Sequence, residues 1–519
     1  MTPARVQRDD NGRVTVAPRE QLRRGSARGR GALAAVIIGS GVAILDGSVV
    51  TIALPTIGRE LDASLEQLQW VVNGYMLSLT ALILVGGALG DRAGRRRVYL
   101  VGVGWFALAS LLCVAAQSPE QLIGARVLQG IGAALLTPGG LALIQGSFRE
   151  EDRAGAIGTW AGLSGIAAAA GPFVGGYLLD HGGWRAIFAV NVPICALVVW
   201  LCHHYMPESR DEESSGPFDV VGAALGAAAL GALTYALTSS GTAGVTTAVT
   251  GAAAVALMAG FLVRQARTRS PLVPLTLFRS RVFSAANGMT FLVYGALSAV
   301  MFFLVIQLQV VSGFSPLLSG LSALPVTVAL LLLSSRLADL SSRIGPRIPM
   351  TVGPIVCAGG VLLLVPVGEG TSFWTGVVPG MTVFALGLAT LVAPLTATVL
   401  AAVADRYAGV ASGVNNAVAR AGSLLAVAAL PPLVGLSGAD YTDPAVLTQG
   451  YRTAQLVCAA LLFAGGVVSW VGLRGTGGRA PAERTGETGG GAGDAAAVHG
   501  DGFPGPGHDP GRGSAAAGG

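Results

Sequence analysis

The chain has 519 residues, of which 52% are hydrophobic and only 12% are charged. Its apolar residues lie in blocks of about 20, the length that a helix needs to cross the roughly 30 Å hydrocarbon layer of a bilayer. Residues 221–263 contain no charged side chain, which excludes solvated surface helices there and predicts a multi-pass membrane protein.

The predicted elements are fourteen membrane-spanning helices, so the fold class is an all-α polytopic membrane protein. In chain order they cover 32–55, 68–89, 98–116, 121–146, 155–179, 186–204, 219–239, 245–263, 284–307, 316–335, 348–366, 373–400, 409–434 and 453–473. They divide the chain into a basic cytoplasmic segment, a six-helix bundle, two inserted spans, a second six-helix bundle and a disordered cytoplasmic tail, at 1–30, 31–207, 208–265, 266–474 and 475–519.

The arginines predict the orientation, because basic residues are retained on the cytoplasmic side of short loops. All 33 basic residues are arginine. With the N-terminus inside, only Arg59, Arg185 and Arg452 fall outside, and Arg126 and Arg420 lie within spans. We therefore expect both termini to be cytoplasmic and the protein to lie in the inner (plasma) membrane.

The first span contains a carboxylate, Asp46, whose insertion into hydrocarbon costs at least about 2.5 to 3.5 kcal/mol. At 1.5 Å per residue, Asp46 lies about 21 Å from the inner end of its span and Arg126 about 8 Å from the outer end of the fourth, so their depths nearly coincide. Two interpretations stay open. The pair is either a static structural bridge, or Asp46 binds protons with an affinity that depends on Arg126 or substrate beside it.

The turn after the second span combines glycines with an acid and several arginines: Gly87, Gly90, Asp91, Arg92, Gly94, Arg95 and Arg96. A positive-inside anchor explains the arginines but neither Asp91 nor the glycines. We favour a conformational latch, in which the glycines permit a tight turn and Asp91 caps a helix or pairs with an arginine when the cytoplasmic side closes.

The chain repeats itself in the same orientation. A worn copy of the latch turn, with Asp339 and Arg343, begins 248 residues later. In a second repeat, the segment Asp152-Arg153-Ala154-Gly155 corresponds to Asp405-Arg406-Tyr407-Ala408-Gly409. Both shifts equal eight predicted helices, which indicates two parallel bundles with a substrate site at their interface.

Three further sets of residues suggest roles in the spans. Gly171, Pro172, Gly175 and Gly176 form a small-residue face with a proline, which indicates either a hinge or close helix packing. Asn416 and Arg420 share a helix face and either line a cavity or join helices. The predicted substrate-binding residues are Trp70, Asn73, Tyr75, Gln129, Trp160, Asn287, Tyr294, Asn416 and Arg420. One acid against two bases within the spans favours neutral or anionic cargo.

Several of these segments resemble a known family. The turn 87–96 resembles the signature loop of the major facilitator superfamily, and 45–55, 126–134, 171–176 and 184–193 resemble its fourteen-span drug:proton antiporter branch, the EmrB/QacA type. The resemblance implies the major facilitator fold and a proton-coupled exporter of hydrophobic or amphipathic small molecules, such as drugs or antibiotics, working by alternating access. It also implies an antiport hinge at 171–176. A metabolite symporter and a transport-inactive sensor remain the alternatives.

Other chemistry finds no support in the sequence. Without lysine the chain has no Walker A motif, and its five histidines and five cysteines show no metal-ligand or disulfide spacing. We expect no enzyme activity, no cofactor, no metal and no nucleic-acid partner. The expected partners of a monomeric protein are its small-molecule substrate, protons and the lipid bilayer.

Overall fold

The computed structural model describes residues 6–8, 14–16, 21–209, 219–239, 244–268, 271–403, 408–438 and 440–474, apart from the side chains of 6–8, 14–16, 48, 84, 154, 161, 162, 164–170, 172, 335, 338, 342, 408 and 409. The predicted tail 475–519 and Asp405-Arg406-Tyr407, in the second copy of the second repeat, therefore lie outside the described residues. Within the N-terminal segment, β1 (Val6–Arg8) and β2 (Val14–Val16) pair antiparallel, with Val6 opposite Val16.

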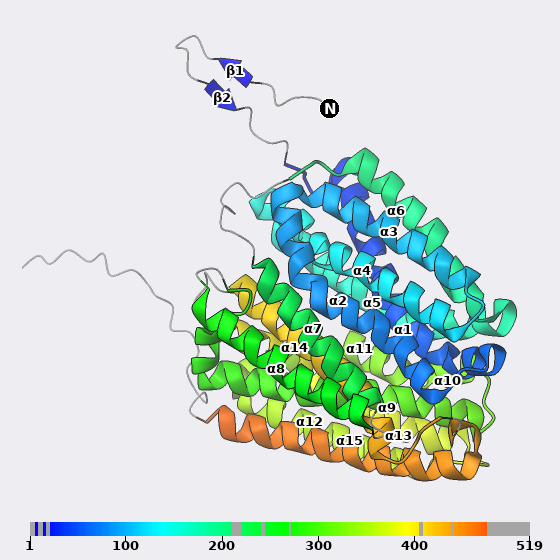
Figure 1. Ribbon diagram of the computed structural model, residues 1–519. Coiled ribbons are helices and arrows are strands. Elements are labelled where there is room, and N and C mark those ends of the chain that lie inside the picture. The colour runs from blue at the N-terminus through cyan, green and yellow to red at the C-terminus, as the bar shows by residue number, and fades with distance from the viewer. Residues whose placement is uncertain are drawn as a thin grey trace, which may run out of the picture. The chain divides into compact units, whose positions relative to one another are not determined.

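The first bundle contains α1 (Ala27–Leu61), α2 (Leu65–Ala93), α3 (Arg95–Ala115), α4 (Pro119–Ser147), α5 (Glu150–Ala189) and α6 (Asn191–Tyr205). Several of these helices begin where the sequence supplies a cap. Ser64 and Gln67 form a capping box at the start of α2, and Ser118 caps α4, whose first residue is a proline. These helices form the upper part of Figure 1, in blue to teal.

The second bundle contains α9 (Arg281–Val310), α10 (Pro316–Leu321), α11 (Leu324–Ile344), α12 (Arg347–Leu364), α13 (Val378–Ala401), α14 (Ala408–Leu433) and α15 (Pro444–Gly472). Short turns of helix precede α9, α13 and α15, namely η2 (Leu275–Arg279), η3 (Phe373–Val377) and η5 (Asp440–Thr442). The same kind of glycine contact between neighbouring helices occurs in each of the two bundles. Gly132 of α4 lies against Phe106 of α3, and Gly360 of α12 lies against Phe384 of α13, so that an added Cβ would be 2.7 and 2.4 Å from the phenylalanine backbone nitrogens.

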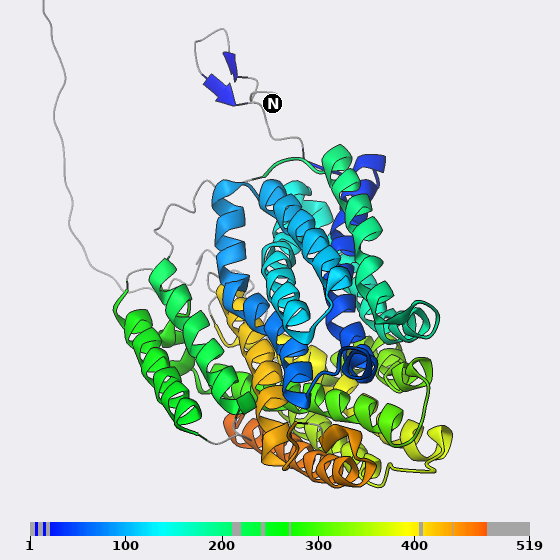
Figure 2. The same cartoon turned by 45° about the vertical axis from the view of Figure 1, so that its right-hand side comes forward.

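The inserted spans α7 (Val220–Thr238) and α8 (Val245–Arg267) form a separate pair on the flank, seen in green in Figure 2. Asp219 holds the pair together, because its carboxylate accepts hydrogen bonds from the Gly222 N–H at 3.0 Å and from Arg264 Nε at 2.9 Å. α7 packs against α2 of the first bundle and α14 of the second. The inserted pair therefore covers one side of the junction between the bundles.

The spans agree with the expected class of fold. Among the described residues, 11 helices are long and apolar enough to cross a membrane, or up to 13 if each of two bent helix pairs is one span. The backbone of α5 breaks at Gly183, with φ of 71°, and this break separates the predicted fifth and sixth spans. The all-α polytopic architecture is confirmed, whereas the count of fourteen stays a prediction.

The bundles contact each other at the ends that the sequence places outside. Gln309 Nε2 donates to the Ile52 carbonyl at 2.8 Å, and Tyr441 Oη donates to the Ala63 carbonyl at 2.7 Å. Burial raises the pKa of the Tyr441 phenol above its usual value, so the phenol keeps its proton and remains a donor. Deeper in the junction, Gln69 of α2 donates to the Val427 carbonyl of α14 at 2.8 Å.

Candidate functional site

A cluster of polar side chains lies inside the first bundle, and we call it the charge cluster: Asp46, Ser110, Arg126, Gln129 and Asn191. Asp46 is 0% exposed and Arg126 is 1% exposed, and the two form a salt bridge through Asp46 Oδ2. Asp46 Oδ1 accepts hydrogen bonds from Gln129 Nε2 and Asn191 Nδ2, both at 2.9 Å. The sequence-based depth estimate is thus confirmed for the contact, and both carboxylate oxygens have donors.

Four helices, α1, α3, α4 and α6, supply the residues of the charge cluster. α1 supplies Asp46, and α4 supplies Arg126 and Gln129, which lie one turn apart and therefore share a face. Arg126 Nε also donates to the Val71 carbonyl of α2 at 3.1 Å, and its guanidinium lies 4.2 Å from the centre of the Tyr75 ring. The ring face offers the buried cation a favourable electrostatic contact.

The charge cluster meets the conditions for a stable buried ion pair. A buried ion pair is stable only when additional hydrogen bonds satisfy both partners, which the charge cluster provides. Of the pair, only Asp46 has a side chain that can exchange a proton, because arginine is not deprotonated in proteins. In the part of the chain that the structure describes, no group of three or more His, Cys, Asp or Glu could hold a metal ion.

The predicted substrate residues of the first bundle occupy different surroundings. The half-buried Trp70 packs against Tyr235 of α7, with ring centres 6.3 Å apart, and thus faces the inserted pair. Tyr75 Oη donates to the Ala43 carbonyl at 3.1 Å, and Trp160 Nε1 donates to Ser40 Oγ at 3.0 Å. Asn73 is fully buried, and neither its amide nitrogen nor its oxygen has a hydrogen-bond partner.

The predicted substrate residues of the second bundle lie on α9 and α14. Asn287 Oδ1 accepts a hydrogen bond from Asn415 at 3.2 Å, so that Asn415, rather than the exposed Asn416, joins these helices. Arg420 is half-buried, and its Nε is buried without a hydrogen-bond partner. Tyr294 is also half-buried, and its carbonyl accepts a hydrogen bond from Ser423 at 3.2 Å.

The latch turn is held within its own bundle. Asp91 pairs with Arg95 one turn on, with 2.8 Å between Asp91 Oδ1 and Arg95 Nη2. Gly94 has a φ of 109°, a conformation that favours glycine, and an added Cβ would be 2.7 Å from Glu208. Gly87 lies against Pro138 of α4, and Asp339 and Arg343 of the second copy are exposed on α11. The pairing of Asp91 with an arginine when the cytoplasmic side closes stays a prediction.

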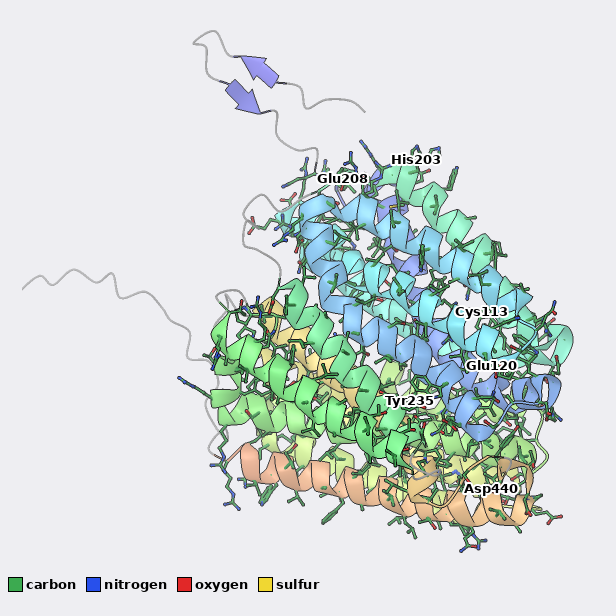
Figure 3. All side chains as sticks on the ribbon, viewed as in Figure 1. Cys113, Glu120, His203, Glu208, Tyr235 and Asp440 are labelled. Atoms are coloured by element: carbon green, nitrogen blue, oxygen red, sulfur yellow. The ribbon has the colours of Figure 1, made fainter. Side chains whose placement is uncertain are left out.

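Glu208, which follows α6, organises the same turn. Its carboxylate accepts a hydrogen bond from the Arg96 N–H at 3.1 Å and lies 3.7 Å from Arg97 Nε. Arg96 Nη2 donates to the His203 carbonyl at 3.0 Å. Figure 3 shows Glu208 and His203 at the same end of the first bundle, whereas Cys113 lies farther along it. Glu208 could not be identified as a partner of the latch turn from the sequence, because no local motif connects it to a turn more than 110 residues earlier.

The predicted hinge residues lie where three helices meet. Gly171 is buried, Gly175 faces Val49 of α1, and Gly176 faces the backbone of Leu317 in α10, where an added Cβ would be only 2.5 Å from the Leu317 Cα. The side chain of Pro172 lies outside the described residues. The helical backbone of α5 breaks at Gly183 and not within 171–176. The structure thus shows a packing role for the glycines, and a hinge motion stays a prediction.

Comparisons with known proteins identify the class. The family model of the Major Facilitator Superfamily matches residues 36–427, and the chain therefore belongs to this superfamily of transporters. It is 34% identical over 464 residues to the methylenomycin A resistance protein of Bacillus subtilis, covering 88% of this chain and 97% of that protein. It is 35% identical over 412 residues to the tetracenomycin C resistance and export protein of Streptomyces glaucescens, covering 78% and 75%.

Solved structures agree on the fold. The POT family transporter PepTSo has a TM-score of 0.64 at 14% identity, covering 85% of this chain and 97% of that one. A bacterial homologue of the lysosomal transporter Spinster, in an inward-facing conformation, has a TM-score of 0.60 at 16% identity, covering 87% and 98%. At these identities the likeness shows the architecture alone, and it confirms the expected major facilitator fold.

Proposed function

We propose that this protein is a proton-coupled exporter of hydrophobic or amphipathic small molecules, such as drugs or antibiotics, in the plasma membrane. Its relatives are named for antibiotic resistance and export, and the match to one of them covers 97% of that relative. The observation that carries the proton coupling is the charge cluster, where one buried carboxylate can exchange a proton beside a permanent cation. Protons, lipid and the cargo are its partners, and both termini face the cytoplasm.

Everted membrane vesicles test this function. In vesicles with an acidic lumen, an exporter carries drug inward in exchange for protons, so that adding a transported drug collapses the pH gradient. A metabolite symporter would leave the gradient intact under the drug panel and would take substrate up into whole cells. A sensor would bind compounds without either flux, and this result would refute the proposal.

Alternating access then requires two states, and in this one the bundles are joined at the predicted outer ends. The cargo would bind between the bundles, next to Tyr75, Asn73 and Arg420. The unpaired amide of Asn73 and the unpaired Nε of Arg420 are buried polar groups, which cost free energy until a ligand or water satisfies them.

The Arg420→Ala variant is expected to lose resistance to acidic antibiotics and to keep resistance to neutral ones. A charged hydrogen bond contributes about 1.5 to 3 kcal/mol, so the affinity for a carboxylate or phenolate should fall about 10- to 150-fold. Binding of purified protein to matched acidic and neutral compounds measures this. Arg452→Ala, at an exposed arginine of α15, is the control. Resistance to quaternary ammonium dyes that survives Arg420→Ala would contradict anionic selectivity.

The Asp91→Asn variant is expected to slow drug turnover about fivefold while drug affinity stays unchanged. The Asp91–Arg95 bridge is partly exposed and contributes about 1 kcal/mol at most, which changes the balance between two states by that factor. Stopped-flow transport in proteoliposomes together with equilibrium binding separates the two quantities. Asp180→Asn, at an exposed acid of α5, should change neither. An equal loss of affinity would show that Asp91 acts on the ligand and is not part of a latch.

A further inference from the structure

Asn191 stands at a break between two helical segments. The helix axes of Phe173–Ala189 and Asn191–Tyr205 differ by 43°. Pro193 lacks a backbone N–H and so cannot donate to the Ala189 carbonyl, which favours a bend at this position. At this position Asn191 Nδ2 donates to Asp46 Oδ1 at 2.9 Å. Asn191 Oδ1 is buried and has no hydrogen-bond partner.

The unpaired oxygen is relevant because the two protonation states of a carboxyl group require different hydrogen-bond partners. A carboxylate only accepts hydrogen bonds, whereas a protonated carboxyl also donates one. The described contacts of Asp46 are all donors, namely Arg126 Nη1, Gln129 Nε2 and Asn191 Nδ2. The amide oxygen of Gln129 already accepts from Arg126 and from Cys113. Asn191 Oδ1 is therefore the free acceptor in the charge cluster.

The other titratable groups around Asp46 leave this assignment intact. These neighbours are Arg126 of α4, Tyr75 of α2, Cys113 of α3 and Cys195 of α6. Phenols and thiols have reference pKa values above about 8, so the side chains of Tyr75, Cys113 and Cys195 are uncharged at neutral pH. The Tyr75 hydroxyl donates to the Ala43 carbonyl.

We propose that Asn191 is a positioning residue that transmits the protonation state of Asp46 to α6. Its Nδ2 donates to the carboxylate, and after protonation the amide rotates so that Oδ1 accepts from the new O–H group. The rotation exchanges the partners of a side chain located at the bend, and it thereby changes the angle between the two helical segments. This inference rests on the proposed function and adds to it a residue outside the predicted site.

The far end of α6 holds the latch turn, which gives the bend an effect at a distance. The 15 residues of α6 span about 22 Å. Beyond them, Glu208 accepts from the Arg96 N–H, and the Ser209 carbonyl accepts from the Arg95 N–H at 2.9 Å. A change in tilt at Asn191 therefore moves the groups that bind residues 95–97. Protonation inside the bundle is thus coupled to the predicted cytoplasmic latch.

Infrared pH titration of the purified protein tests the inference without depending on transport. The protonated-carboxyl band of Asp46 is identified by its loss in Asp46→Asn. In Asn191→Leu the titration midpoint should rise by about one pH unit, because the lost bond to the charged carboxylate is roughly twice as strong as the lost bond to the acid. In the isosteric Asn191→Asp it should rise further, because two adjacent carboxyl groups do not both ionise. Drug-driven proton movement should show the same shifts.

Gln307→Leu is the matched control. Gln307 of α9 is also a fully buried amide whose nitrogen donates, to the Val367 carbonyl at 3.2 Å, and whose oxygen has no partner. The Gln307→Leu variant should have a lower melting temperature, while the midpoint of the Asp46 infrared titration should not change. An unchanged midpoint in both Asn191 variants would overturn the inference, and Asn191→Asp decides alone if Asn191→Leu does not accumulate. Absence of drug-driven proton movement in the unmutated protein would instead refute the proposed function.

Discussion

Asp46→Asn is expected to abolish drug-driven proton movement while the protein remains folded in the membrane. The amide has nearly the shape of the carboxylate but does not exchange a proton. Its oxygen can accept from Arg126, and its N–H can donate to the unpaired oxygen of Asn191. Arg126 also keeps the Val71 carbonyl and the Tyr75 ring, which limit the cost of losing its counter-charge. Vesicle gradient collapse and size-exclusion chromatography measure the two effects.

Asp46→Glu is the companion variant, because it retains a titratable group and should preserve transport with a shifted pH profile. Asp219→Asn is the control for removing a buried acid, since Asp219 holds α7 to α8 outside the charge cluster. It should affect stability but not coupling. Normal proton-coupled export by Asp46→Asn would leave the Asp46–Arg126 pair with a static structural role.

Arg126→Leu is expected to stop transport by leaving Asp46 permanently protonated. Without its counter-charge, a buried carboxylate avoids a large desolvation cost by binding a proton. The variant should therefore accumulate, bind drug with an affinity independent of pH, and show no proton exchange. Drug-binding measurements at acidic, neutral and alkaline pH check this.

The double variant Asp46→Asn with Arg126→Leu separates charge from packing. Asp46→Asn alone leaves a buried cation without a counter-charge, for which a destabilisation of about 3 to 5 kcal/mol is typical and the remaining contacts of Arg126 favour the lower end. Removing both charges should restore much of the stability but no transport. Equal stability of the single and double variants would mean that Arg126 does not depend on Asp46.

The fold could be predicted to a large extent, because the bilayer restricts what a chain of this composition can form. Blocks of about 20 apolar residues require helices, and the arginines and the repeated turns indicate two parallel bundles. The helix at each predicted span follows from this local rule. The count of fourteen stays a prediction, since the described residues contain at most 13 helices that are long and apolar enough to span a membrane.

The candidate site could be predicted only where a strong rule acts on single residues. A charge in hydrocarbon needs a partner, and depth along two antiparallel helices was sufficient to pair Asp46 with Arg126. No such rule applies to a neutral amide or a hydroxyl, so Asn191 and Ser110 were missed. Gln129 was predicted to bind substrate, whereas its amide nitrogen donates to Asp46 and Ser110 within the charge cluster.

The sequence by itself therefore determined the membrane architecture, the superfamily resemblance and the buried ion pair, because each depends on hydrophobic length, charge placement or a local motif. Only the tertiary structure decided which amides complete the charge cluster and that Glu208 holds the latch turn. It also decided that Gly176 faces Leu317 across the bundle junction. The physical reason is that these contacts join helices distant in sequence, and their partners depend on helix rotation and on bends such as the one before Asn191, which local composition does not specify.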